Sequence, residues 1–166
     1  ESYYKINENT DFRKLLESKN FDKIYIYTNG TYGHGDNVVK HLNIDDKISF
    51  IYGRDNLRNM IKENFMKPHI NSFNTVNNSI KYQNNIINTN DHQIYFFDDM
   101  EENLFTAHNI GWITILIKPN GNTNEYINYS YSNIYSALIN MNILKNEFIT
   151  FLIILSSFPP SFDLFV

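Results

Sequence analysis

Residues 93–111, with the sequence QIYFFDDMEENLFTAHNIG, decide the fold that we expect for this chain. Residues 94–97 are aromatic or β-branched, which is typical of a strand buried inside a sheet. The acidic pair Asp98 and Asp99 follows this strand directly, and residues 101–109 are predicted to form a helix. A buried strand that ends in two carboxylates and leads into a helix indicates an α/β protein with a site at the strand end.

The same alternation of strand and helix continues on both sides of this stretch. Further strands are predicted at residues 23–28, 48–52 and 112–117. Helices are predicted at residues 11–18, 36–42, 56–65, 71–80 and 132–141. We expect the helix at 56–65 to end before Pro68, and residues 83–91 to be a surface loop. Strands separated by helices imply βαβ units, so the predicted fold is a three-layer, Rossmann-like α/β core around a parallel sheet.

The length and composition limit the function classes. A chain of 166 residues is long enough for one core, and the absence of cysteine argues against a disulfide scaffold, a zinc ribbon or a thiol nucleophile. The net charge of -4 argues against a nucleic-acid partner. The apolar residues 148–158 are too few to span a bilayer and are predicted to be a core strand, a core helix or an aberrant translated tail. We therefore expect a cytoplasmic protein without a membrane partner.

Three polar clusters fall at strand ends or loops of this predicted sheet. They are Thr28-Asn29-Gly30, Lys67 and the pair Asp98-Asp99. Ligands of parallel sheets bind at the carboxyl ends of the strands, so we expect the three clusters to meet there. His34 lies between glycines and is predicted to face a substrate, whereas the other histidines lack the spacing of metal ligands.

Each cluster also has a simpler interpretation. Asp98 and Asp99 either bind Mg²⁺, a cation that takes oxygen ligands, or cap the following helix. Thr28, with the amides of Asn29 and Gly30, either binds an anion or forms an ordinary turn. Lys67 either neutralises a phosphate or is a solvated surface charge.

Taken in order, four segments resemble the haloacid dehalogenase-like hydrolases, and in particular their pyrimidine 5'-nucleotidase branch. The segments are KIYIYTNGTYGHGDNVVKHLNI, FIYGRD, KPHINSF and IYFFDDMEENLFTAHNIGWITILI, and the resemblance covers residues 10–118. It implies a Mg²⁺-dependent phosphatase whose substrate is a small phosphorylated metabolite such as a nucleoside monophosphate.

The resemblance also implies roles for individual residues. Thr28 matches the family's phosphoryl-binding threonine, with Asn29 and His34 fitting the pattern of this branch. Lys67 matches its third-motif lysine. Asp99 is expected to coordinate Mg²⁺ directly, and Asp98 to support it.

One family motif is not found in the sequence. The first motif, Asp-x-Asp, supplies the nucleophile on a strand that lies between the second-motif and fourth-motif strands, and no Asp-x-Asp precedes Thr28. Residues 1–22 resemble the return from the family's cap to its core, so we expect the first motif and most of the cap to lie before Glu1. The strands on either side should then lose their shared partner. We divide the chain into a core at 1–145 and an apolar tail of uncertain role at 146–166.

Three hypotheses about function follow. The first is a phosphomonoester hydrolase that acts through an aspartyl-phosphate, and for which this chain alone is inactive. The second is a binding module that kept the phosphate pocket without the chemistry. The third is a truncated gene product without independent function.

Overall fold

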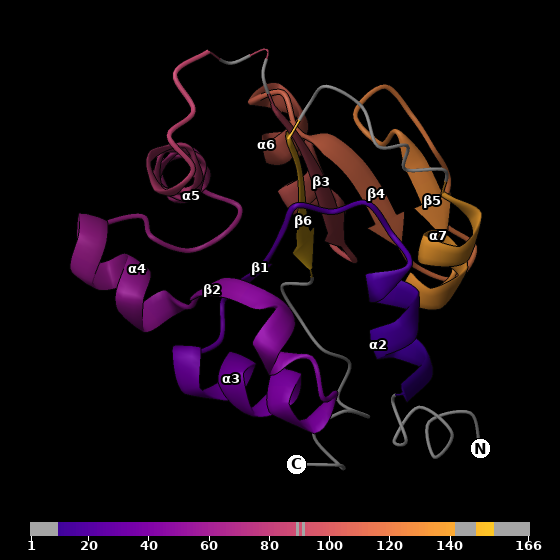
Figure 1. Cartoon of the computed structure of the whole chain (residues 1–166). Helices are drawn as coiled ribbons and strands as arrows, with labels where there is room; N and C mark the ends of the chain where they lie inside the picture. Colours follow the sequence, from indigo (N-terminus) through magenta and orange to yellow (C-terminus); the bar gives the residue numbers. More distant parts are fainter. Residues whose placement is uncertain (1–9, 89, 91, 142–148, 155–166) are drawn as a thin grey trace.

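The computed structural model describes residues 10–88, 90, 92–141 and 149–154. In chain order the elements are α2 (Thr10–Glu17), β1 (Lys23–Tyr27), α3 (Tyr32–His41), the 3-10 helix η1 (Asp45–Lys47), β2 (Ile48–Tyr52), α4 (Arg54–Ile61), α5 (Ile70–Gln83), β3 (His92–Asp98), α6 (Glu101–Asn109), β4 (Ile113–Ile117), β5 (Tyr129–Tyr131), α7 (Ile134–Asn140) and β6 (Ile149–Ile154). The strands form one sheet, and the helices pack around it, as Figure 1 shows. The predicted Rossmann-like α/β layout is confirmed.

The six strands are ordered β2-β1-β6-β3-β4-β5, and all neighbouring strands are parallel. The last strand in sequence, β6, lies between β1 and β3, with Ile154 opposite both Ile26 and Phe97. The prediction that these two strands lack a shared partner is therefore wrong, because a segment of the apolar tail pairs with both. Of the interpretations offered for residues 148–158, the structure shows a strand at residues 149–154.

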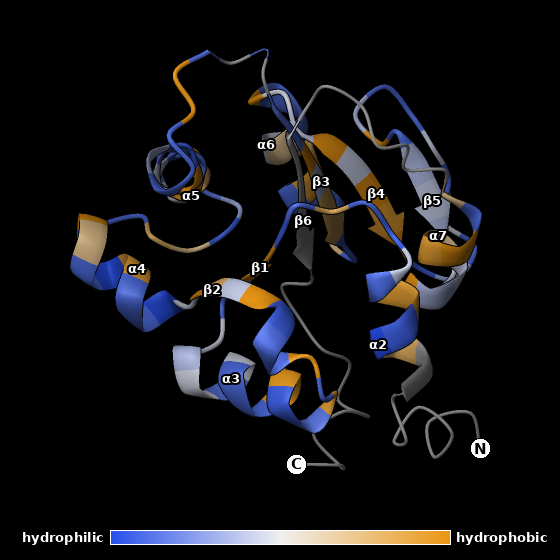
Figure 2. Ribbon diagram, viewed as in Figure 1, coloured by the Kyte–Doolittle hydropathy of each residue, from blue (hydrophilic) through white to orange (hydrophobic). Residues whose placement is uncertain are grey.

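The sheet is covered on both faces by helices. On one face, α2, α3 and α7 pack against alternate strand residues such as Ile24 and Ile115. On the other face, α4, α5 and α6 pack against Tyr25 and Leu116. Apolar residues gather on the strands and hydrophilic residues on the outer helices, as Figure 2 shows. This double burial explains why the strand sequences are continuously apolar instead of alternating.

Two predicted helices have different ends in the structure. Helix α3 begins at Tyr32, earlier than the predicted residue 36, because Thr31 caps it by accepting a hydrogen bond from the His34 amide at 3.2 Å. Helix α4 ends at Ile61, earlier than the predicted residue 65, because Lys62 has a φ of 64°. The chain thus leaves the helix well before Pro68. Strand β5 was not predicted at all.

The loops after β1 and β2 are held together at the carboxyl edge of the sheet. The Thr28 amide donates to the carbonyl of Tyr52 at 2.9 Å, and the Arg54 amide donates to the carbonyl of Gly30 at 2.8 Å. A Cβ on Gly53 would lie 2.4 Å from the backbone nitrogen of Tyr32. Only glycine therefore allows α4 to begin so close to the start of α3.

Candidate functional site

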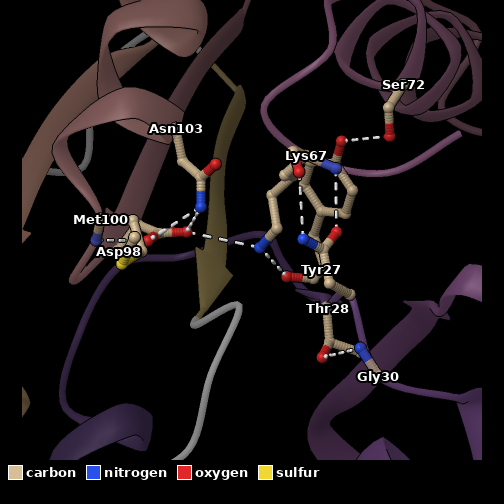
Figure 3. Close-up of polar contacts among 9 residues, drawn as sticks. Tyr27, Thr28, Gly30, Lys67, Ser72, Asp98, Met100 and Asn103 are labelled. Carbon is tan, nitrogen blue, oxygen red and sulfur yellow. Dashed lines mark hydrogen bonds and ion pairs between the residues drawn. The ribbon is translucent and has the colours of Figure 1, made fainter. Parts of the chain in front are cut away.

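The carboxyl edge of the sheet brings together the three polar clusters predicted from the sequence (Figure 3). Thr28 follows β1, Asp98 ends β3, and Lys67 comes from the loop between α4 and α5. All three side chains are buried. Asp99 is half-buried beside Asp98. The expected meeting of these clusters is thus observed, whereas their roles in binding remain predictions.

Lys67 is the central residue of this edge. Its side chain is completely buried, and its Nζ atom donates to the carbonyl of Tyr27 at 2.7 Å and to Oδ2 of Asp98 at 3.3 Å. The same Nζ lies 4.6 Å from the ring centroid of Tyr27 and 5.6 Å from that of Phe96. The interpretation of Lys67 as a solvated surface charge is therefore wrong. An ammonium group has three hydrogens, so one remains for a further acceptor.

Burial sets the charge state of this lysine. It lowers the pKa of the Lys67 ammonium to about 8, and the carboxylates of Asp98 and Asp99 oppose the shift. At neutral pH the group is cationic, but it loses its proton at a much lower pH than a surface lysine does. An anion bound here would keep the ammonium charged to higher pH.

The carboxylate of Asp98 is saturated by hydrogen bonds. Its Oδ1 accepts from the amide of Met100 at 2.7 Å, and both oxygens accept from Nδ2 of Asn103, at 3.2 and 3.1 Å. Its Oδ2 also faces Lys67. Asp98 thus fastens the start of α6, as the capping interpretation requires, but capping alone does not explain its ion pair with a buried lysine.

This arrangement separates the two aspartates. Both oxygens of Asp98 are engaged within the protein, and Asp99 is the more exposed of the two carboxylates. Among the described residues, no group of three or more histidine, cysteine or acidic side chains is placed to hold a metal ion. The donor set fits Mg²⁺ when water and phosphate oxygens complete the coordination, because Mg²⁺ often uses only one or two protein carboxylates.

The Thr28 hydroxyl is held in place by the loop that follows β1. Oγ1 of Thr28 accepts a hydrogen bond from the Gly30 amide at 2.9 Å. A Cβ on Gly30 would lie 3.2 Å from that oxygen and 3.4 Å from Cδ2 of His34, so the His34 ring lies over this turn. The Gly30 amide is therefore engaged with Thr28, whose side chain lies at the carboxyl end of β1.

Asn29 joins the threonine loop to the lysine loop. Its side chain donates to the carbonyl of Lys67 at 3.1 Å and accepts from the amide of Lys67 at 2.9 Å. This two-point contact fixes the backbone on either side of the lysine stem. The side chain of Asn29 thus positions Lys67, a role that the sequence did not predict.

Three other residues complete the site and were given no role from the sequence. Tyr27 supplies a carbonyl and a ring to Lys67, and its hydroxyl bonds that of Ser72 at the start of α5. Asn103 holds Asp98 from the first turns of α6. The sequence feature that could have predicted this role is the spacing of five residues between Asp98 and Asn103. It places Asn103 in the first turn of the helix that follows the strand end.

The strand between the threonine and aspartate strands carries no acidic group where it ends. Ile154 pairs with Ile26 and Phe97, two residues before Thr28 and one before Asp98. The sequence that follows, residues 155–162, is LSSFPPSF. An Asp-x-Asp motif is therefore absent from β6 and from the eight residues after it.

No protein-family model matches the chain, and no curated protein sequence matches it. Among the described residues, every helix is too short or too polar to span a lipid bilayer. The interpretation of the site thus depends on its geometry and on the motif resemblance.

Proposed function

We propose that this chain carries the phosphate-binding and metal-binding part of a Mg²⁺-dependent phosphomonoester hydrolase of the haloacid dehalogenase-like type, with nucleoside monophosphates as its substrate class. The observation that supports this most strongly is the buried ion pair between Lys67 and Asp98 beside Thr28. Burying two charges costs more than their attraction returns in most settings, so such a pair is weak as a stabilising device. Binding of an anionic ligand to the Lys67 ammonium would explain why this chain contains a buried ion pair.

Each residue has a defined part in binding. The Thr28 hydroxyl donates to a phosphoryl oxygen, and the third hydrogen of the Lys67 ammonium faces the same group. Asp98 and Asn29 hold Lys67 in place. Asp99 holds the metal ion, which when bound neutralises charge on the phosphoryl oxygens. In the family that this chain resembles, an aspartate attacks phosphorus, and the described part of the sheet does not supply that group.

Binding therefore tests the proposal better than turnover does. We expect CMP to bind the folded chain in the presence of Mg²⁺, as measured by isothermal titration calorimetry, and cytidine not to bind. Thr28→Val and Asp99→Asn should each weaken binding about tenfold or more, because each removes a polar contact to an ionic ligand. The matched controls Thr75→Val on α5 and Asp36→Asn on α3 should leave it unchanged.

Two results would overturn the proposal. One is the absence of Mg²⁺-dependent CMP binding by a chain shown to be folded. The other is CMP binding that Thr28→Val and Asp99→Asn leave intact. Robust turnover of UMP, CMP or p-nitrophenyl phosphate that Asp99→Ala abolishes would instead reveal a nucleophile within this chain.

A binding module without chemistry is the second candidate, and β6 favours it. This strand occupies the place between β1 and β3, and it brings no carboxylate to the site. A separate strand carrying Asp-x-Asp would have to displace it. The coding sequence adjoining Glu1 discriminates the two candidates, since an encoded hydrophobic strand with Asp-x-Asp favours the hydrolase and its absence favours the module.

The hypothesis of a truncated gene product without function is disfavoured by the sheet, because β6 pairs with a strand on each side. We expect a single cooperative urea transition followed by circular dichroism and by tryptophan fluorescence. Trp112, buried against Phe73 and Phe96, reports on the packing of α5 against the sheet. A broad, non-cooperative transition would support the third hypothesis.

A further inference from the structure

A pocket borders the same two loops as the proposed phosphate site. It has a volume of about 380 Å³ and is lined by Thr31, Arg54, Asp55, Arg58, Phe65 and Met66. Thr31 lies three residues after Thr28, and Met66 directly precedes Lys67. The two loops are joined by the Asn29 side chain, so the pocket and the proposed phosphate site share their framework. The proposed function leaves this pocket without a role.

Two arginines outnumber the one carboxylate in the lining of this pocket, so the lining carries a net positive charge. Arg54 and Arg58 lie one turn apart on α4, and in the part of the chain that the structure describes neither forms a side-chain hydrogen bond or ion pair. The lining carboxylate, Asp55, offsets part of this charge. Its Oδ1 accepts from the amide of Tyr32 at 2.8 Å, and this bond lowers the pKa of Asp55, which the nearby Arg54 also helps to lower.

Local electrostatics oppose the position of Arg54. Like charges four residues apart on a helix repel each other, and a cation in the first turn opposes the helix dipole. Arg54 is the first residue of α4, so it meets both costs. The remaining arginine of the chain, Arg13, instead pairs with both oxygens of Asp46. An anion between Arg54 and Arg58 would reduce the repulsion between the two guanidinium groups.

The other side of the pocket is apolar. Phe65 packs against the core and Met66 is 40% exposed, so an aromatic ring and a polarisable thioether face the space between the helices. Guanidinium groups bind phosphate and carboxylate in a forked geometry and stack on planar rings. The pocket therefore suits an anionic group attached to a planar or apolar body.

We infer that this pocket, with Arg54 and Arg58, binds a second anionic group of the ligand whose phosphoryl group lies at Thr28 and Lys67. The inference rests on the proposed function and adds a second anionic group to the substrate class proposed there. The preferred ligand is a nucleotide with two separate anionic groups, and a simple nucleoside monophosphate is the weaker ligand.

Calorimetry with two cytidine nucleotides tests this inference. Cytidine 3',5'-bisphosphate should bind the wild-type chain about tenfold or more tightly than CMP, because a second charge-assisted contact is added. The double variant Arg54→Gln/Arg58→Gln should lose this advantage while its affinity for CMP stays unchanged. The control Arg13→Gln, which alters a paired surface arginine, should leave both affinities unchanged. Equal binding of the two nucleotides to the wild type, or an equal loss for both in the double variant, would overturn the inference.

A second arm separates this inference from the proposed function. Phenyl phosphate is titrated into Thr28→Val and followed by the NMR signals of the arginine Nε–H groups. Shifts that Arg54→Gln/Arg58→Gln abolishes would establish the pocket as an anion site even if CMP fails to bind at Thr28. Unchanged arginine signals at millimolar phenyl phosphate would overturn the anion site itself, whatever the result with CMP.

Discussion

Two groups of charged residues in this molecule differ in burial more than in geometry. On the surface, Arg13 contacts both oxygens of Asp46, at 2.5 and 2.7 Å, and Glu17 links it to Lys47. In the core, Lys67 lies 3.3 Å from a single oxygen of Asp98. The surface group has the shorter contacts.

The buried pair nevertheless has the greater energetic weight. Water screens the surface group, and pairs of that kind contribute little to stability. The side chains of Lys67 and Asp98 are completely buried, so each charge depends on the other and on Tyr27 and Asn103. The comparison shows that the distance between two charged groups does not by itself indicate how strongly the pair affects stability. The burial of the two groups has the larger influence.

Asp98→Ala should have the largest effect. It leaves the Lys67 ammonium buried without its carboxylate, and loss of one partner of a buried pair costs about 3–5 kcal/mol. Urea denaturation at pH 7 measures the loss. The double variant Lys67→Met/Asp98→Leu should recover much of it, because no charge is then left unpaired. A loss as small as that of a surface substitution would show that water reaches the pair.

The pH dependence of the free energy of unfolding should reflect the protonation of Lys67. Its pKa is about 8 in the fold and 10.5 in the unfolded chain, so the unfolded chain binds more protons between these values. Relative to Lys67→Met/Asp98→Leu, the free energy of unfolding of the wild type should therefore rise by about 2 kcal/mol from pH 7 to pH 9.5. Urea titrations of both proteins at the two pH values measure this. Parallel behaviour of the two proteins would mean that the lysine is not desolvated.

Ligand affinity should change in the opposite direction over the same pH range. The phosphoryl group of CMP is doubly charged at both ends of the range, whereas Lys67 loses its positive charge above about pH 8. CMP should therefore bind more weakly at pH 9.5 than at pH 7, as measured by calorimetry. Affinity that stays constant would remove Lys67 from the binding site.

Asn29→Ala should have an intermediate effect. It removes two hydrogen bonds to the backbone of Lys67, and each contributes about 0.5–1.5 kcal/mol. Urea denaturation should show a loss of about 1–3 kcal/mol, again from two bonds of that strength. The exposed Asn37 of α3 provides the control, since Asn37→Ala should not destabilise the protein. Equal behaviour of the two variants would contradict the positioning role of Asn29.

The surface group should show the smallest effect. Arg13→Gln removes contacts between exposed groups, and their attraction is screened by solvent. We expect its urea midpoint to lie closer to the wild type than that of Asn29→Ala, and the remaining difference to shrink in 0.5 M NaCl. A loss as large as that of Asp98→Ala would reverse the order of the two charge groups.

Much of the site was predictable because strand ends are local features. Thr28, Lys67, Asp98 and Asp99 follow or lie between patterned segments, and parallel strands bring their carboxyl ends to one edge. The contacts among them were not predictable. That Asn29 holds Lys67 depends on how two loops 38 residues apart meet, and that Gly30 is engaged with Thr28 depends on the conformation of the turn after β1.

The sequence by itself determined the layered α/β fold, since apolar strands and helical periodicity are written in neighbouring residues. Only the tertiary structure decided which strand lies at the centre. Residues 149–154 are apolar enough for a strand or a core helix, and no local pattern specifies their neighbours. Pairing with β1 and β3 joins residues more than fifty positions apart, and this choice is made by the packing of the whole sheet.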